Sequence, residues 1–310
     1  MIATVTLNSA IDKTYYLGGF GKGGVYRVAR QIAEPGGKGN NVAKVARLLG
    51  AEVAASGFAA GANGAFIVGR LAERGIRTAF VQAQGESRIC LNIIDETDGS
   101  STELLEQGPV VTETDVAELK RTLRELASSS SIVVLSGSLP QGVPVSLYAE
   151  LIETIRTANA KAYLDTSGAA FAAALQAKPD FVKPNEQELA AWLGRELRSE
   201  DEVAQAASSL AYLGIGAVCV TLGGRGAIAF LDGKGYRVKA PKLEAVNTVG
   251  CGDSFVAGMA YAAERGASPE ERLRSAAAAA AANAMSDRAG HLELRRYKEY
   301  LNEVEVTAFR

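Results

Sequence analysis

The segment NTVGCGDSF, residues 247–255, places an aspartate in what reads as the first turn of a helix. Gly250 and Gly252 are two residues apart, and Asp253 follows at once. A helix N-terminus carries unpaired backbone N–H groups and a partial positive charge, so amides here, that of Cys251 included, are suited to hold a phosphate. Asp253 itself fits two roles, a cap for the helix or a base beside a bound phosphate.

A second glycine-rich segment, EPGGKGNN at residues 34–41, runs into the helical pattern NNVAKVARLLG. It does not fit the P-loop signature, because Gly39 rather than Ser or Thr follows Lys38, and it does not fit G-x-G-x-x-G. Lysine and asparagine side chains beside exposed backbone can bind a phosphate or sugar hydroxyls. A left-handed turn before a helix cap is the alternative, and this segment alone does not decide between the two.

The residue counts exclude several kinds of chemistry. Only one histidine, His291, occurs among the 310 residues, and we interpret it as a surface or packing residue. Three cysteines, Cys90, Cys219 and Cys251, fit neither a disulfide framework nor a zinc knuckle and are typical of a reducing cytoplasm. Catalysis is therefore expected to use carboxylates, lysines and backbone amides, with or without a metal ion.

Charge and hydropathy give no sign of a macromolecular or lipid partner. The net charge is -2, and the Lys and Arg residues are scattered rather than gathered in a stripe. No stretch approaches the roughly 18 uncharged apolar residues of a membrane span. We expect neither a nucleic acid nor a membrane as a partner.

From about residue 130 onward, apolar runs alternate with helical patterns. Strands are expected at 131–137, 160–168, 181–189 and 216–223, with helices at 146–159 and 199–214. This alternation predicts an α/β fold whose parallel sheet is covered by helices on both faces. Ligands of such sheets bind at the carboxyl ends of the strands, which directs attention to Ser136, Ser138, Asp165, Lys183, Asn185, Thr221 and Gly223.

The first third of the chain follows a different pattern. Residues 2–8 read as a core strand, whereas 25–34, 88–95 and 101–108 are strand-like, and some have no helix between them. We expect these three to form a small, mostly antiparallel sheet that stands off the main sheet and acts as a lid.

The domain organisation follows from this lid. No long linker divides the chain, so we expect one domain over residues 1–310, with lid segments within about 10–35 and 87–110. The alanine run at 274–285 predicts a buried helix, with Asn283 as the polar residue near its end.

Five motifs occur in order along the chain: GGKGNN, SGSLPQG, KPNEQE, TLGGRG and NTVGCGDSFVAG. Together they resemble the ribokinase-like, PfkB-type carbohydrate kinases over essentially the whole length. The resemblance implies a ribokinase-like three-layer α/β/α fold, a mostly parallel central sheet with a small β-sheet lid, and phosphate transfer from ATP with Mg²⁺. The opening TLNSAID and the GGKGxN form look like the branch that includes 1-phosphofructokinase and tagatose-6-phosphate kinase. Ser9, Asn247 and Cys251 stand where the family usually has Pro, Asp and Ala.

The resemblance also implies a role for each matching residue. Asp253 would take the proton from the sugar hydroxyl, and Gly250, Cys251 and Gly252 would surround the transferred phosphate. Arg88 would meet the phosphate already on the sugar; the implied substrate-binding residues are Asp12, Gly37, Lys38, Asn41 and Arg88. Those implied for ATP are Lys183, Asn185, Thr221, Gly223, Gly226 and Asn283. Glu188 and Asn185 would orient Mg²⁺ through water.

Several functions remain open at this point. Fructose 1-phosphate is the acceptor that we expect from the TLN-x-AID and GGKG motifs, with tagatose 6-phosphate and fructose 6-phosphate as alternatives. A nucleoside kinase is disfavoured, because Lys38 and Arg88 would be costly to desolvate in a neutral pocket. A non-catalytic sugar-phosphate-binding protein would lack the base, and Asp253 is present. Exposed lid strands favour a homodimer through the lid.

Overall fold

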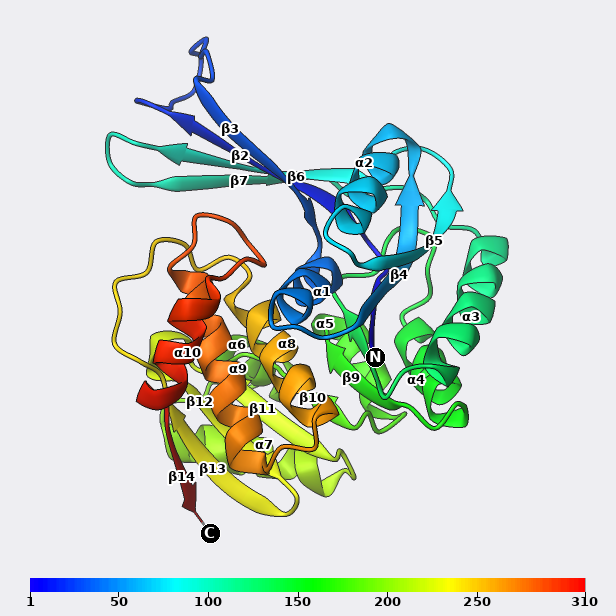
Figure 1. Ribbon diagram of the computed structural model, residues 1–310, viewed down its shortest axis with the longest axis vertical. Coiled ribbons are helices and arrows are strands. Elements are labelled where there is room, and N and C mark those ends of the chain that lie inside the picture. Colours follow the sequence, from blue (N-terminus) through cyan, green and yellow to red (C-terminus); the bar gives the residue numbers. More distant parts are fainter. Residues whose placement is uncertain (310) are drawn as a thin grey trace.

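The computed structural model describes residues 1–309 and confirms the predicted α/β fold (Figure 1). Its large sheet has ten strands within this range. The parallel strands, in order across the sheet, are β5 (Arg77–Ala83), β4 (Val53–Ala60), β1 (Ile2–Thr6), β8 (Ile132–Ser136), β9 (Lys161–Asp165), β10 (Phe181–Val182) and β11 (Ala217–Thr221). Beyond β11 the sheet continues with three antiparallel strands, β12 (Ala227–Leu231), β13 (Lys234–Lys239) and β14 (Glu305–Phe309).

Helices cover both faces of the large sheet. All residues of β1, β4 and β8 are buried, as expected for apolar strands enclosed on two sides. One face carries α1 (Lys38–Leu48), α2 (Gly61–Ala72), α8 (Cys251–Glu264), α9 (Pro269–Ala284) and α10 (Leu294–Glu303). The other carries α3 (Glu113–Ser128), α4 (Leu147–Thr157), α5 (Gly168–Leu175), α6 (Glu186–Leu193) and α7 (Glu200–Tyr212). In the part of the chain that the structure describes, none of the helices has the length and apolar character needed to cross a bilayer.

The expected strand at 181–189 is wrong beyond its second residue. The strand ends at Val182, and Pro184, which has no N–H to donate, follows closely. Asn185 then caps α6: its side-chain oxygen accepts from the Glu188 N–H at 2.8 Å, and the Glu188 carboxylate accepts from the Asn185 N–H at 2.9 Å. This reciprocal capping box begins a helix where the apolar pattern had predicted a strand.

A separate four-stranded sheet stands away from the body (Figure 1). We call it the small sheet; its order is β3 (Arg30–Gly36), β2 (Ala10–Leu17), β6 (Arg88–Asp95) and β7 (Ser101–Leu105). Two of its strand pairs are antiparallel and the central pair, β2 with β6, is parallel, which confirms a mostly antiparallel sheet. The strand expected at 25–34 instead begins at Arg30, and β2 was not identified as a strand from its residue pattern.

The alanine-rich segment forms α9, a largely buried helix as predicted, and it approaches α8 very closely. A Cβ placed on Gly258 of α8 would lie 2.5 Å from the Ser275 carbonyl oxygen of α9. The Ser275 hydroxyl donates to the Gly258 carbonyl at 2.8 Å. Only glycine permits this approach, which fixes the position of α8 and therefore of its first turn.

Candidate active site

Three charged residues that are distant in sequence meet at the carboxyl edge of the large sheet. Asp165 ends β9, Lys183 follows β10, and Lys38 begins α1. One oxygen of the Asp165 carboxylate, Oδ1, lies 3.3 Å from Lys183 Nζ and 3.5 Å from Lys38 Nζ. Asp165 and Lys183 are buried, whereas the Lys38 side chain is 39% exposed. We call these three residues the charged triad.

Within the charged triad, Asp165 and Lys38 each favour the charged form of the other. Burial favours the neutral form of Asp165, but Lys183 and Lys38 outweigh it and lower the pKa of the carboxyl. Asp165, in turn, is the main cause of a raised pKa for the Lys38 ammonium. The second carboxylate oxygen, Asp165 Oδ2, is buried and has no hydrogen-bond partner among the described residues. Of the triad, Lys38 therefore has the largest exposed surface at this edge of the sheet, while the Asp165 carboxylate is enclosed.

Asp253 lies in the first turn of α8, but it does not cap the helix. The N-cap residue is Gly250, at φ 82°, and no side chain caps this end. One oxygen of the Asp253 carboxylate accepts from Asn41 Nδ2 at 2.8 Å. Burial raises the pKa of Asp253 to about 6, against the opposing pull of the Lys38 charge. The geometry thus supports a base that Asn41 orients.

The first turn of α8 offers backbone donors for an anion. Within residues 1–309 the N–H groups of Gly252 and Asp253 meet no main-chain acceptor, whereas that of Cys251 donates to the Thr248 carbonyl at 3.3 Å. Lys183 Nζ lies 3.3 Å from the place that a Cβ on Gly252 would occupy. Free amides, the helix dipole and an adjacent ammonium together form an anion site.

The glycines of the GGKG segment have a steric role. A Cβ on Gly36 would lie 2.1 Å from Cγ of Asp12, so the small sheet can hold that carboxylate only beside glycine. Gly37 has φ 93°, and a Cβ there would lie 2.8 Å from Thr6 Cγ2 at the end of β1. Gly36 was missed by the sequence reasoning, which had no way to place Asp12 against it. These glycines bring Lys38 and α1 close to the large sheet.

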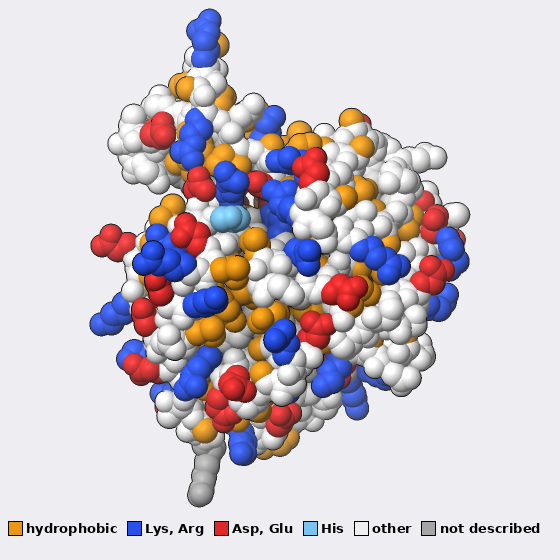
Figure 2. Space-filling view, viewed as in Figure 1, with side chains coloured by type: hydrophobic (Ala, Val, Ile, Leu, Met, Phe, Trp, Pro, Cys, Tyr) orange, Lys and Arg blue, Asp and Glu red, His pale blue; other side chains and the backbone are white. Residues whose placement is uncertain are grey.

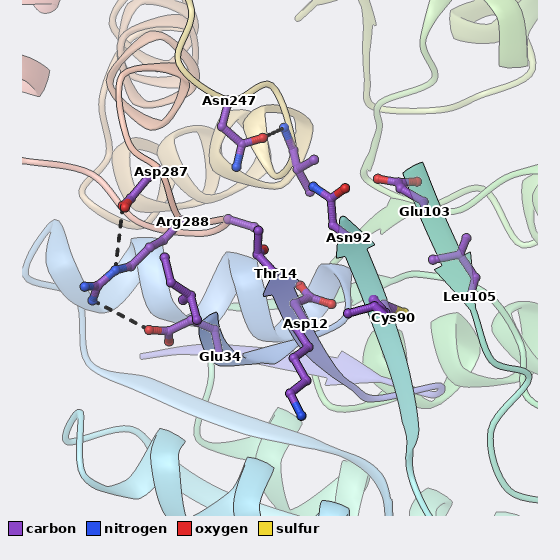
Figure 3. A pocket seen from close by; sticks show the side chains of 15 residues that line it. Asp12, Thr14, Glu34, Cys90, Asn92, Glu103, Leu105, Asn247, Asp287 and Arg288 are labelled. Atoms are coloured by element: carbon purple, nitrogen blue, oxygen red, sulfur yellow. Dashed lines mark hydrogen bonds and ion pairs between the residues drawn. The ribbon is translucent and has the colours of Figure 1, made fainter. Parts of the chain in front are cut away.

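A polar pocket lies between the small sheet and the body (Figure 3). Asp12, Asn92 and Glu103 line it from the small sheet. Burial raises the pKa of Asp12, and the charges of Lys44 and Arg88 oppose that rise. From the loop before α8 the lining includes Asn247, whose side-chain oxygen accepts from the Val249 N–H at 2.9 Å. Asparagine therefore makes the local turn that the family's usual aspartate also favours.

Arg88 lies near this pocket without lining it. Its Nε donates to the Asn8 carbonyl at 3.3 Å, so the start of β6 is tied to the loop after β1. The remaining guanidinium donors have no ion-pair partner within residues 1–309.

A second cavity of about 510 Å³ opens on the other side of the first turn of α8. Its predicted lining residues include Thr221, Gly223 and Gly226, and its volume suits a ligand larger than a simple sugar. The walls are largely apolar and end at Gly252; they include Pro241, Leu243, Phe255, Ala277, Ala280 and Ala281. The alanines of α9 thus line a cavity as well as packing against α8.

Asn283 is brought close to this cavity but does not face it. The side chain is fully buried; its Nδ2 donates to the Val249 carbonyl at 2.9 Å and its Oδ1 accepts from the Gly290 N–H at 3.0 Å. Asn283 therefore ties the loop before α8 to the loop after α9. Lys183 and Asn185 also lie outside the cavity lining, next to two residues that belong to it: Lys183 is beside Gly252, and Asn185 is beside Thr221.

The metal expectation rests on Asn185 and Glu188. Their capping box uses Glu188 Oε2 and leaves the other carboxylate oxygen unused. Among the described residues no group of three or more His, Cys, Asp and Glu side chains could hold a metal ion. Mg²⁺ in phosphate-transferring sites needs one or two carboxylates, since water and substrate phosphates supply its other ligands. The unused oxygen of Glu188 fits that modest requirement.

Comparison with known proteins identifies the family. The model of the pfkB family carbohydrate kinases matches residues 5–293. The chain belongs to this family. A tagatose-6-phosphate kinase of Staphylococcus epidermidis is 36% identical over 309 residues, which is 99% of either chain. The structure of Escherichia coli phosphofructokinase-2 with potassium is 31% identical, with a TM-score of 0.92 over 97% of this chain and 98% of that one.

A pfkB-family structure from Thermotoga maritima, described as a possible 1-phosphofructokinase, is 28% identical, with a TM-score of 0.88 over 100% of both chains. Family membership makes this protein a phosphotransferase with a hydroxyl acceptor, and a kinase implies ATP as the phosphate donor. The resemblance carried by the motifs is thereby confirmed. One charged residue of the site, Asp165, had been noted only as a polar residue after a strand and had been given no role.

We predict that Asp165→Asn strongly destabilises the protein. The change leaves Lys183, whose side chain is 5% exposed, without its anionic partner. Loss of one partner of a buried ion pair costs about 3–5 kcal/mol. Thermal unfolding should show a clearly lower midpoint. Glu305→Gln, which removes the exposed partner of Lys239, is the matched control and should cost about 0–1 kcal/mol. Equal unfolding midpoints for the two variants would show that the ion pairs of the charged triad do not stabilise the fold.

Proposed function

We propose that this protein is an ATP-dependent sugar-phosphate kinase with Asp253 as its base. The carrying observation is that this buried carboxylate lies beside the free amides of the α8 first turn, in a segment where Val249 lines the polar pocket and Gly252 lines the 510 Å³ cavity. In this proposal the polar pocket takes the sugar phosphate and the 510 Å³ cavity takes ATP. The chain forms one catalytic domain, and the small sheet is its lid.

The proposed reaction needs only positioning, charge neutralisation and a base. Asp253 accepts the proton of the sugar hydroxyl while the hydroxyl oxygen forms a bond to the γ-phosphorus. The bond from that phosphorus to the β,γ-bridging oxygen breaks, and ADP leaves. The N–H groups of Gly252 and Asp253, with Lys38 and Lys183, neutralise the charge of the transferred group. Asn41 holds the carboxylate in line.

The remaining site residues have supporting roles in this proposal. Asp12, Gly37 and Asn41 hold the sugar, Arg88 pairs with its phosphate, and Thr221, Gly223 and Gly226 contact the nucleotide. Mg²⁺ would be oriented through water by Glu188 and Asn185 and would supply charge neutralisation between the donor phosphates. Asn283 supports the site by fixing the loop before α8 and the loop after α9.

For the acceptor we propose fructose 1-phosphate, with tagatose 6-phosphate and fructose 6-phosphate as the alternatives. The TLN-x-AID and GGKG motifs support this choice, as do relatives named for phosphorylated ketohexose substrates. Coupled ADP release measured with each of the three compounds is the deciding experiment. We expect the highest kcat/KM with fructose 1-phosphate. A higher value with either 6-phosphate would transfer the assignment to that sugar, and inactivity with all three would refute the function.

We also propose that two copies pair through the small sheet. Its outer strand β7 is exposed along its length, and Leu104 and Leu105 are 53% and 63% exposed. An open strand edge with apolar side chains is a ready pairing surface. The structure of inhibited E. coli phosphofructokinase-2 is described as tetrameric. Light scattering on the purified protein tests this point, and a monomer mass at micromolar concentration would rule the pairing out.

We predict that Asp253→Asn lowers kcat by several orders of magnitude and leaves ATP affinity nearly unchanged. Asparagine keeps the shape but cannot accept the proton. Asp115 occupies the same third position of α3 as Asp253 occupies in α8, so Asp115→Asn is a matched control for general effects on a helix start. That control should keep wild-type turnover. If Asp253→Asn retained a third of wild-type kcat, Asp253 would not be the base.

We predict that Arg88→Ala raises KM for the sugar phosphate about 10- to 150-fold and changes KM for ATP little. This range corresponds to the loss of one charge-assisted hydrogen bond of about 1.5–3 kcal/mol. Weak activity on unphosphorylated fructose should hardly change, since that acceptor has no phosphate to lose. Arg77→Ala, at an exposed position of β5, controls for the lost charge. Equal losses on fructose and its phosphate would mean that Arg88 only supports the small sheet.

A further inference from the structure

A basic pocket of about 250 Å³ lies beside the active site, on the outer side of α1. Figure 2 shows blue Lys and Arg side chains gathered around the pale-blue histidine, below the small sheet. The charged and titratable residues of this lining are Glu34, Lys44, Arg47, Arg74, Arg288 and His291. Glu34 and Arg288 also line the polar pocket that the catalytic proposal assigns to the sugar phosphate, whereas the other four line neither substrate pocket.

Lys44 is the most unusual member of the basic pocket. It is only 4% exposed, and its one hydrogen bond goes to the Ala289 carbonyl at 2.9 Å. No described carboxylate lies within 4.0 Å of Nζ, although an ammonium has three donors to satisfy. Burial lowers the pKa of Lys44 to about 8. A buried cation without a close anionic partner is costly, and such groups mark binding sites.

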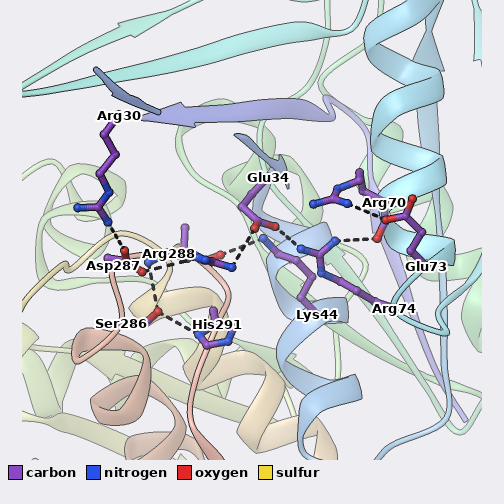
Figure 4. Close-up of polar contacts among 11 residues, drawn as sticks. Arg30, Glu34, Lys44, Arg70, Glu73, Arg74, Ser286, Asp287, Arg288 and His291 are labelled. Carbon is purple, nitrogen blue, oxygen red and sulfur yellow. Dashed lines mark hydrogen bonds and ion pairs between the residues drawn. The ribbon is translucent and has the colours of Figure 1, made fainter. Parts of the chain in front are cut away.

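The one carboxylate in the lining is already used by two other cations. Glu34 pairs with Arg74, and its second oxygen lies 3.7 Å from Arg288 Nη1 (Figure 4). Arg47 donates only to main-chain carbonyls, at 3.4 Å to Arg74 and 3.3 Å to Ala51. Lys44 and Arg47 therefore face the pocket with positive charge that no described side chain neutralises at close range.

We propose that the basic pocket binds a compact phosphate-bearing anion, inorganic phosphate or a small phosphate monoester, through Lys44 and Arg47, at a site that adjoins the polar pocket and shares Glu34, Arg288 and Ala289 with it. Its volume is below the roughly 300–1,000 Å³ of sites for drug-sized ligands, so the ligand is small. Ammonium and guanidinium donors that converge from several elements suit phosphate oxygens. Lys38, Arg88 and the first turn of α8 are absent from the lining.

The bound anion also acts on the catalytic centre through the loop that forms one wall of the pocket. Gly290 and His291 belong to that wall, and their N–H groups donate to Asn283 Oδ1 at 3.0 and 3.3 Å. Asn283 in turn holds the loop before α8. A ligand that orders the 288–291 segment therefore also stabilises the loop that holds the first turn of α8. Anion binding in the basic pocket and substrate binding at the active site are then thermodynamically linked.

Calorimetric titration of the full chain tests this site. Arg88→Ala is used as the background, because it removes the proposed phosphate contact of the sugar site. The probes are inorganic phosphate and glycerol 3-phosphate, each with and without saturating ATP. Lys44→Met and Arg47→Ala should each weaken binding of at least one probe by tenfold or more. Arg70→Ala, on α2 and outside the lining, is the matched control and should leave affinity unchanged.

Hydrogen exchange gives a second measurement that locates the anion. Phosphate should slow exchange in the 283–291 segment of the Arg88→Ala protein and not in the protein that also carries Arg47→Ala. Arg47 is exposed, so this arm remains decisive if Lys44→Met does not fold. No binding of either probe at 10 mM, or unchanged affinity in both pocket variants, would overturn the proposal. Displacement of phosphate by fructose 1-phosphate would also overturn it, since the pocket would then be part of the sugar site.

Discussion

The arrangement of this active site depends on one buried carboxylate that two lysines share. Asp165 Oδ1 lies 3.3 Å from Lys183 and 3.5 Å from Lys38, and these residues come from three separate elements. A single anion thus holds the start of α1 against the ends of β9 and β10. It also pairs with both ammonium groups beside the amides of α8, so in the proposed mechanism the same ion cluster serves structure and transition-state electrostatics.

The active site also requires α8 to pack closely against α9 and the loop at Gly290. Gly258 lets α9 approach α8 more closely than any side chain at that position would permit. Gly250 likewise lets the loop at Gly290 come close, because a Cβ on Gly250 would lie only 2.8 Å from the Gly290 nitrogen. Asn283 then bridges the loops before and after this helix pair. Small residues and one buried amide therefore hold the helix whose first turn carries the Asp253 carboxylate.

Local signals in the sequence predicted much of this molecule. Continuous apolar runs correctly indicated β1, β8 and β11, because strands covered on both faces need no polar alternation. The strand expected through residue 189 failed, since the Asn185–Glu188 capping box acts over three residues and overrode the apolar pattern. The small-sheet strand β2 was missed because its residues Lys13 and Thr14 are half-buried and read as neither core nor loop.

Contacts between distant segments were beyond sequence reasoning. Nothing in the local pattern relates Asp165 to Lys38, or Asn41 to Asp253 across a separation of 212 positions. The steric role of Gly36 likewise depends on the register that places Asp12 opposite Glu34, beside this glycine in the β2–β3 pair. The family resemblance assigned roles to the residues of the five motifs. The structure was needed to find the ion pairs of Asp165, the contacts of Asn283 and the basic pocket.

The pH dependence of kcat/KM in wild type and Asn41→Ala tests the central claim most directly. Asp253 must be ionised to act as base, and its pKa of about 6 predicts that activity falls as the pH decreases through about 6. The Asn41 amide donates to the carboxylate and so stabilises its charged form. Its removal should raise the pKa of Asp253 and move the acid limb to higher pH. An acid limb that stays in place in Asn41→Ala, or moves to lower pH, would contradict Asp253 as the base that Asn41 holds.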